Sequence, residues 1–153
     1  MKYILGVDPG GTVGFAFYPL EGKVFQADKV QPGQAPVNTF LDWAKEQINS
    51  DVLVVCERFT ITTNTAKLTA GGSHDALDVI GVLKHLCRWS GAEFEFQTPA
   101  QAKKFVSDAQ LKSLELWVKS QDHARDAIRH LIFGIVYHTS GETCKDLKSR
   151  MSE

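Results

Sequence analysis

Three acidic residues and a histidine stand where predicted core segments of this chain end, or where a helix turns one edge outward. Asp8 and Glu57 each follow an apolar run, and His123 and Asp126 are three residues apart in the last strong helical pattern. Carboxylate oxygens are hard ligands of the kind that Mg²⁺ takes in proteins. The candidate chemistry is therefore metal-assisted, provided that the fold brings these side chains together.

The turn after Asp8 leaves its backbone open to an approaching ligand. Pro9 has no N–H for a strand ladder, and Gly10 and Gly11 permit positive φ, so the chain can reverse tightly into a second strand over 12–18. The same residues also fit an ordinary hairpin in which Asp8 only forms the turn. The pattern acquires chemical meaning only together with the other acidic residues.

The apolar pattern predicts three antiparallel strands before any helix. After the opening hairpin, residues 22–29 are expected to form an edge-like third strand, and residues 30–36, with two prolines, a connector. Residues 37–49 have helical spacing, and the uninterrupted apolar run 52–56 is typical of a parallel strand covered on both faces. Glu57 is thus expected at the carboxyl end of a central strand.

The second half of the chain is mainly helical in pattern. Acidic and aromatic residues alternate over 92–97, which indicates a strand at a sheet edge. The helices that we predict are 73–89 with Ser73 as its cap, one that begins at Pro99 behind the cap Thr98, a segment around 111–118, and 123–137.

The last helix and the residues after it differ in character. At about 100° per residue, His123, Asp126 and His130 share one edge of the helix, beside its apolar stripe. That edge presents two histidines around a carboxylate. Residues 139–153 are polar and poor in large apolar side chains, so we expect a loosely held tail.

Composition bounds the class of protein. At 153 residues the chain fits one domain, and 43% apolar and 23% charged residues are ordinary for a folded protein. No apolar run approaches the ~20 residues of a membrane span, and we see no targeting segment, so we expect a cytoplasmic protein without membrane contact. Three cysteines without CxxC spacing predict reduced thiols rather than disulfides or a zinc site.

The formal net charge of −1 offers nucleic acid no general attraction, so any such surface must be local. Residues 58–74 contain Arg58 and Lys67, five threonines and no acidic residue. Residues 99–119 contain four lysines against two acidic residues. The first of these stretches also fits a solvated polar loop.

The order of predicted elements matches the ribonuclease H-like fold, and three motifs narrow the resemblance. DPGGTVGFA at 8–16, CERF at 56–59 and HARDAIRH at 123–130 resemble the signatures of RuvC-type Holliday junction resolvases. The resemblance covers residues 1–138 as one nuclease domain and leaves 139–153 outside it as a polar C-terminal tail. It implies an α/β protein with a mixed five-stranded sheet, three antiparallel strands and then two parallel ones, flanked by helices.

The resemblance also implies an activity and a ligand set. Members of this family are metal-dependent endonucleases that resolve four-way DNA junctions. Two Mg²⁺ ions, or Mn²⁺ in their place, stabilise the charge on the attacking and leaving oxygens and lower the pKa of the attacking water. By resemblance, Asp8 would bridge both ions, Glu57 would hold one, and Asp126 with His123 would hold or tune the other. No organic cofactor is implied.

The partners implied are branched DNA and a second copy of the chain. The residues that we expect to contact DNA are Arg58, Phe59, Lys67, Lys103 and Lys104. A homodimer would supply the two cuts that a junction needs, and the helix over 73–89 is its expected contact, because its apolar face is wider than one stripe. We interpret His130 as structural or close to DNA; Arg125 and Arg129 either face DNA or form surface pairs.

Three other functions fit parts of the sequence. A flap or general branched-DNA endonuclease would use the same catalytic residues, and a ribonuclease H-like module could bind nucleic acid without cutting it. The D-x-G-G-T pattern at 8–12 also resembles the first phosphate loop of actin-like ATPases and sugar kinases. Those folds duplicate the domain, and this chain has the length of only one half.

Overall fold

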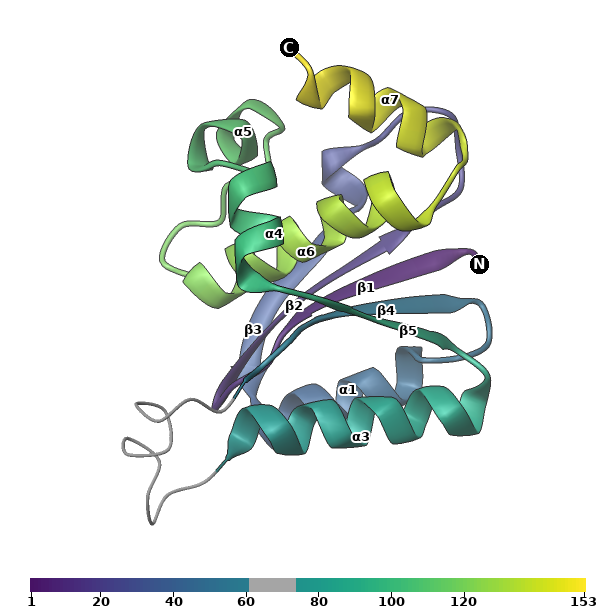
Figure 1. The fold of residues 1–153 in the computed structure, drawn as a ribbon, viewed down its shortest axis with the longest axis vertical. Coiled ribbons are helices and arrows are strands. Elements are labelled where there is room, and N and C mark those ends of the chain that lie inside the picture. The colour runs from purple at the N-terminus through teal and green to yellow at the C-terminus, as the bar shows by residue number, and fades with distance from the viewer. Residues whose placement is uncertain (61–73) are drawn as a thin grey trace.

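The computed structural model describes residues 1–60 and 74–153 (Figure 1). The strands are β1 (Tyr3–Asp8), β2 (Thr12–Pro19), β3 (Gln31–Pro36), β4 (Val52–Glu57) and β5 (Glu93–Gln97). The helices are η1 (Ala27–Lys29, a 3-10 turn), α1 (Val37–Gln47), α3 (Asp75–Ser90), α4 (Pro99–Phe105), α5 (Asp108–Ser113), α6 (Asp122–His138) and α7 (Glu142–Met151).

The strands of the described chain form one mixed sheet in the order β3-β2-β1-β4-β5. β1, β2 and β3 pair antiparallel, whereas β4 lies parallel to β1 and β5 parallel to β4. This is the α/β fold and the strand arrangement that the sequence predicts, and β5 is at the predicted edge. Because β1, β4 and β5 run in the same direction, their carboxyl ends lie side by side at the same end of the sheet.

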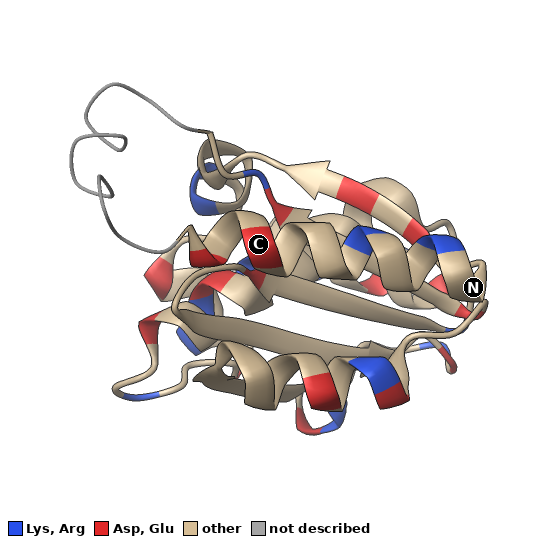
Figure 2. Ribbon diagram, turned by 90° about the horizontal axis from the view of Figure 1, so that it is seen from below, with Lys and Arg blue, Asp and Glu red and all other residues tan. Residues whose placement is uncertain are grey.

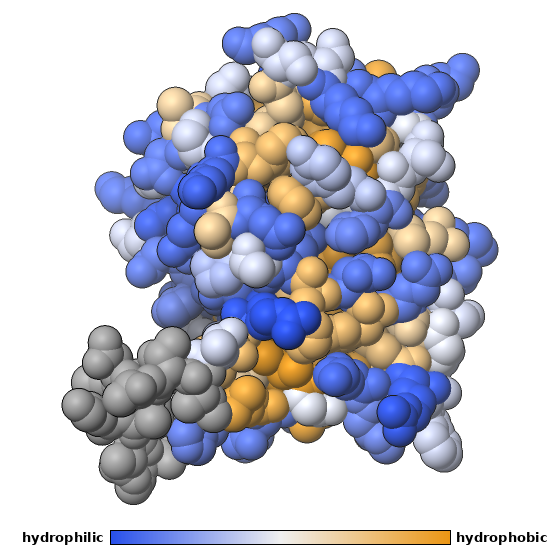
Figure 3. All heavy atoms as spheres, in the orientation of Figure 1, coloured by the Kyte–Doolittle hydropathy of each residue, from blue (hydrophilic) through white to orange (hydrophobic). Residues whose placement is uncertain are grey.

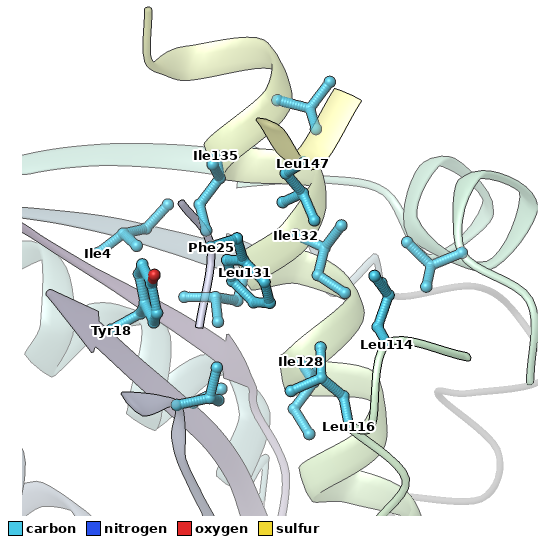
Figure 4. Packing of buried hydrophobic residues seen from close by; sticks show 14 of the residues in the cluster. Ile4, Tyr18, Phe25, Leu114, Leu116, Ile128, Leu131, Ile132, Ile135 and Leu147 are labelled. Carbon is cyan, nitrogen blue, oxygen red and sulfur yellow. The ribbon is translucent and has the colours of Figure 1, made fainter. Parts of the chain in front are cut away.

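Helices cover both faces of the sheet (Figure 1). Alternate strand residues serve the two sides: Ile4 and Val55 belong to the core beneath α6, and Leu5 and Val54 to the core facing α1 and α3. Figure 4 shows the first core, where α6 packs on the strands from one side. In Figure 3, apolar atoms gather near β5 and α3, and hydrophilic residues cover much of the remaining visible surface.

Two glycines allow α6 to lie directly on the strands. A methyl group on Gly14 in β2 would overlap the backbone carbonyl of His123, and one on Gly6 in β1 would meet the backbone of Ala127 and Leu131. Any larger side chain would lift the helix from the sheet, since backbone atoms cannot move aside as a flexible side chain can. The glycines therefore set the height of the helix that carries the candidate site residues.

The prediction for the third strand is wrong. Residues 22–29 contain η1, and the strand is the proline-containing segment that we expected to be a connector. A strand at the edge of a sheet can hold proline if its nitrogen faces outward, and Pro32 and Pro36, an even number of residues apart, both pair with β2 from that edge. Phe25 is buried in the core beside Tyr18 instead of lying on a strand.

The expectation of a loosely held tail is also wrong. The segment after α6 forms α7, which buries Cys144 and Leu147 against the core beneath α6. Asp146 accepts a hydrogen bond of 2.8 Å from the backbone of Phe25, which ties α7 to the segment before η1. The helix expected around 111–118 ends early, at Ser113, because the chain then adopts positive φ at Glu115.

The predicted cap of α4 and the predicted free thiols are confirmed. Thr98 caps α4 with Pro99 in its first turn, and the Gln101 side chain completes a capping box. The three cysteines are buried free thiols in the described chain. Within residues 1–60 and 74–153, no helix is long and apolar enough to cross a membrane. The start of the helix expected at Ser73 lies outside the described residues.

Candidate active site

Three neighbouring parallel strands each end on a polar residue. Asp8 ends β1, Glu57 ends β4 and Gln97 ends β5, and Glu57 pairs directly with Gln97 in the sheet register. Val7 and Cys56 are partners one residue earlier, so Asp8 and Glu57 leave the sheet side by side. Crevices at the carboxyl ends of parallel strands are where α/β folds bind ligands.

Asp8 is a buried carboxylate beside a half-exposed histidine. Its Oδ2 lies 2.9 Å from Nδ1 of His123, whose side chain is 44% exposed. Burial raises the pKa of Asp8 to about 6; the hydrogen bond from His123 opposes this rise, and the negative charges of Glu57 and Asp126 add to it. The ionised form of Asp8 thus sits in a place that favours an added positive charge.

Glu57 faces a different histidine. Its Oε2 lies 2.7 Å from Nε2 of His130, and Nδ1 of the same ring lies 2.8 Å from Oε1 of Gln97. Both His130 and Gln97 are 1% exposed. Burial also raises the pKa of the neighbouring Cys56 thiol, so this cysteine stays protonated and is unsuited to act as a nucleophile.

Asp126 is paired with two basic side chains, one from α6 and one from α4. Its Oδ1 accepts a hydrogen bond of 2.8 Å from Arg129, and Nζ of Lys103 lies 3.7 Å from its Oδ2. Arg129 is buried and also donates to Val106 O and to the carboxylate of Asp108. These groups line a polar hollow of about 430 Å³.

The predicted ligands are thus near one another but are not gathered around one point. Within the described residues, no three histidine, cysteine, aspartate or glutamate side chains are placed to hold a metal ion. The donor set nevertheless fits a hard divalent cation, because the charges of Glu57 and Asp126 both act on buried Asp8. A bound cation would compensate the charge of the same carboxylates that His123, Lys103 and Arg129 now contact. The ligand roles of Asp8, Glu57, His123 and Asp126 stay predictions.

The residues expected to contact DNA fall into separate places. The guanidinium of Arg58 stacks 4.5 Å from the ring of Phe96, and Phe59 packs partly buried against the core that faces α3. Lys103 and Lys104 are exposed on α4. Lys67 lies outside the described residues. Basic and acidic residues are interspersed along the drawn helices (Figure 2).

The two arginines of α6 do not point freely outward. Arg125 donates to Val118 O at 2.6 Å and stacks 4.5 Å from the Trp117 ring, and Arg129 holds two carboxylates from a buried position. Both arginines are therefore paired within the chain, and Arg129 makes its pairs from a buried position instead of on the surface.

The sequence led us to interpret His130 as structural or close to DNA, and its burial agrees with a structural role, but the sequence did not link His130 or Gln97 to Glu57. The helical period did place His130 on the same edge as His123 and Asp126, and this signal could have linked it to a strand-end carboxylate. For Gln97 the signal was weaker: it is the last residue of a predicted strand, as Asp8 and Glu57 nearly are. A glutamine at such a position is common, so only the pairing of β5 with β4 reveals its contact.

Comparisons with known proteins identify the fold. A comparison with models of protein families finds no match, and a comparison with curated proteins finds none. Among solved structures, Thermus thermophilus RuvC matches with a TM-score of 0.64 and 16% identity, covering 89% of this chain and 95% of RuvC. T. thermophilus RuvC in complex with a Holliday junction substrate matches with a TM-score of 0.62 and 13% identity, covering 90% and 95%. The chain therefore has the ribonuclease H-like fold of RuvC.

Proposed function

We propose that this chain is a metal-dependent endonuclease that cuts branched DNA, with the four-way (Holliday) junction as its substrate. The observation that carries this proposal is the pair Asp8 and Glu57 at the ends of adjacent parallel strands, beneath the helix that bears His123 and Asp126. The RuvC fold, which one solved neighbour presents together with a junction, supports the choice of substrate.

The residues of the site have distinct tasks in this proposal. Mg²⁺, or Mn²⁺, would supply stabilisation of the charge on the attacking and leaving oxygens of a phosphodiester. Asp8 would be the central ligand, because it is buried and the negative charges of Glu57 and Asp126 both act on it. Glu57 binds from a fixed position against His130. His123 and Asp126 complete the set from α6, and the exposure of His123 leaves it free to turn toward a bound cation.

DNA would approach over the end of α4. Lys103 lies next to Asp126 and is exposed, so a phosphate of the cut strand can draw it away from that carboxylate. Lys104, Arg58 and Lys67 are the further basic residues that we expect to contact the DNA backbone, and Phe59 would contact bases near the branch. Binding of this kind depends on local charge, because the whole chain carries a net charge of −1.

The working unit in this proposal is a homodimer. One chain carries one site, whereas resolving a junction requires two cuts of like polarity, which a two-fold pair supplies. Most of the wide apolar face of α3 is buried within the chain, including Val79 and Leu83. The side chains left for a partner are Val82, which is 38% exposed, and Trp89, which is 85% exposed. The cytoplasmic location stays a prediction from the sequence.

The proposal is tested by incubating the protein and Mg²⁺ with a four-way junction, a flap, a linear duplex and an RNA–DNA hybrid. Labelled strands should show two symmetrical nicks near the branch of the four-way junction, and sedimentation at micromolar concentration should show a dimer. Equal cutting of the flap would favour a general branched-DNA endonuclease. A monomer that cuts one strand at scattered positions would contradict resolution.

One observation favours a second function, a module that binds branched DNA without cutting it. In the described chain each acidic site residue already has a histidine, lysine or arginine partner. Such a module would bind the junction equally well in EDTA and in Mg²⁺ and leave its strands intact. The same set of substrates separates the two functions.

A further inference from the structure

A continuous chain of hydrogen-bonding groups leads from the active-site edge into the protein. It runs from Glu57 at the end of β4, through His130 in the middle of α6, to Gln97 at the end of β5. The two contacts measure 2.7 and 2.8 Å, within the normal range of hydrogen bonds. The carboxylate of β4 is thus contacted by a histidine of α6, which is itself contacted by a glutamine of β5.

We propose that His130 and Gln97 are positioning residues that fix the Glu57 carboxylate for metal binding. This inference rests on the proposed function. Groups that orient a metal ligand from behind cost roughly 10–100-fold in metal affinity or activity when they are removed. A glutamate needs such support more than an aspartate does, because its longer side chain has more rotamers to lose.

The chain of contacts fixes the direction of the bond to Glu57. As placed, the amide nitrogen Nε2 of Gln97 is buried and has no partner among the described residues. If the amide were turned over, Nε2 would donate to His130 Nδ1, and an oxygen would replace the unpaired nitrogen. With an ionised Glu57, Nε2 of His130 donates to the carboxylate in both orientations of the amide: the ring is neutral if the amide is turned over, and it carries a proton on both nitrogens if the amide stays as placed. The bond to Glu57 does not depend on which way the amide points.

The backbone holds both ends of this chain in register. Glu57 and Gln97 are direct partners across the parallel pair β4 and β5, and the next residue, Arg58, donates its N–H to Gln97 O at 2.7 Å. His130 is packed on all sides, so its ring cannot swing away as an exposed ring could. These constraints place the carboxylate of Glu57 before any cation binds.

The test measures Mn²⁺ binding to the full chain without DNA, by the electron paramagnetic resonance signal of free Mn²⁺. His130→Ala should weaken binding roughly 10–100-fold. Gln97→Met, which keeps the volume of the side chain and removes its polar end, should weaken binding by a smaller factor. His85→Ala, at an exposed position on α3, is the matched control and should bind as the wild type does. Circular dichroism establishes that each variant is folded.

A double variant shows whether His130 acts through Glu57. Glu57→Gln should itself weaken Mn²⁺ binding, and adding His130→Ala should then cause no further loss, because the two changes remove one interaction. If Glu57→Gln weakens binding while folded His130→Ala and Gln97→Met bind like the wild type, the positioning role is overturned and the proposed function stands. If His130→Ala does not fold, Gln97→Met alone decides. A wild type that binds no Mn²⁺ overturns both the inference and the proposed metal site.

Discussion

The two strand-end carboxylates meet the same helix in contrasting ways. Asp8 contacts His123 in the first turn of α6, where the ring is 44% exposed. Glu57 contacts His130 two turns later, where the ring is 1% exposed and also touches Gln97. One pair can open toward solvent, and the other is enclosed. A single helix edge thus provides both an adaptable end and a fixed end for one site.

The difference has an electrostatic counterpart. Asp8 is destabilised as an anion by burial and by two neighbouring carboxylates, whereas Glu57 has a buried hydrogen-bond partner of its own. Asp8 therefore stores a preference for a cation at a cost in stability, as expected for a functional residue. Glu57 contributes to the folded structure as it stands. Changes at the two carboxylates should affect stability in opposite directions.

The largest expected effect on stability is the pH dependence caused by Asp8. Its pKa in the folded chain is about 6, against an ordinary value of 3.8. Between these pH values the folded state holds a proton that the unfolded state has lost, so stability falls as pH rises through this window and stays lower above it. About two pKa units correspond to about 3 kcal/mol at neutral pH.

Asp8→Asn should remove this pH dependence. In urea unfolding with EDTA, the variant should exceed the wild type by up to about 3 kcal/mol at pH 7.5 and match it near pH 4. Glu57→Gln keeps an acceptor for His130 but loses its charge, and should lower stability by about 1 kcal/mol at pH 7.5. Wild type and Asp8→Asn curves that stay parallel from pH 4 to 7.5 would contradict the contrast.

The next effect comes from the two strand glycines, Gly14 and Gly6, on which α6 packs. Gly14→Ala should push on His123, and Gly6→Ala should push on Ala127, each lowering the free energy of unfolding by about 1–3 kcal/mol, because the added methyl group meets backbone. Gly81→Ala is the control: its added methyl group meets no described atom within 4 Å, and it should gain about 0.5–1 kcal/mol in helix α3. If Gly14→Ala unfolds at the same urea concentration as the wild type, α6 does not lie as closely as described.

The exposed position of His123 should tolerate replacement by another metal-binding residue, and the buried position of His130 should not. His123→Asp should cut a four-way junction roughly tenfold faster than His123→Ala, since a carboxylate there can still bind a cation. His130→Asp should cut the junction more slowly than His130→Ala, because it buries a second negative charge against Glu57. Initial rates in Mg²⁺ measure both comparisons. Equal rates for the two His123 variants would make that residue structural.

The smallest effect concerns the salt dependence of DNA binding. Lys103→Ala and Arg58→Ala should each flatten the log–log slope of affinity against salt by up to roughly 0.9 if each side chain neutralises one phosphate. Lys148→Ala on α7 is the control and should leave the slope unchanged, and Lys67→Ala belongs in the same series. Titrations of a labelled junction in EDTA measure the slopes. Unchanged slopes for both variants would place the basic surface elsewhere.

The sequence predicted most strongly where one local rule dominates. The apolar run before Glu57 and the Thr98-Pro99 cap are each decided by a few neighbouring residues, and the structure confirms both. Prediction from the sequence failed where packing between distant residues decides the structure. Phe25 was predicted on a strand, but it packs in the core beside Tyr18. Leu147 lies in a segment that is polar overall, but it is buried in the core beneath α6.

The site shows the same division. The motifs singled out Asp8, Glu57, His123 and Asp126 as candidate ligands, and the strand ends and the helical period predicted where in the fold each would lie. The support behind Glu57 was not predictable, since it depends on β5 pairing with β4 in a register that no local pattern reveals. The pairing of Asp126 with Arg129 and Lys103 likewise depends on how α4 packs on α6.

The most direct test of the central claim compares the cleavage and the binding of a four-way junction by the same preparations. Asp8→Asn and Glu57→Gln should each lower the cleavage rate, since each removes a metal-binding charge and keeps the side-chain size. The loss should exceed the roughly 100-fold that follows removal of a residue that only orients a metal ligand. Both should bind the junction in EDTA about as tightly as the wild type. A folded Asp8→Asn variant that cuts the junction at the wild-type rate in Mg²⁺ would contradict the proposed site.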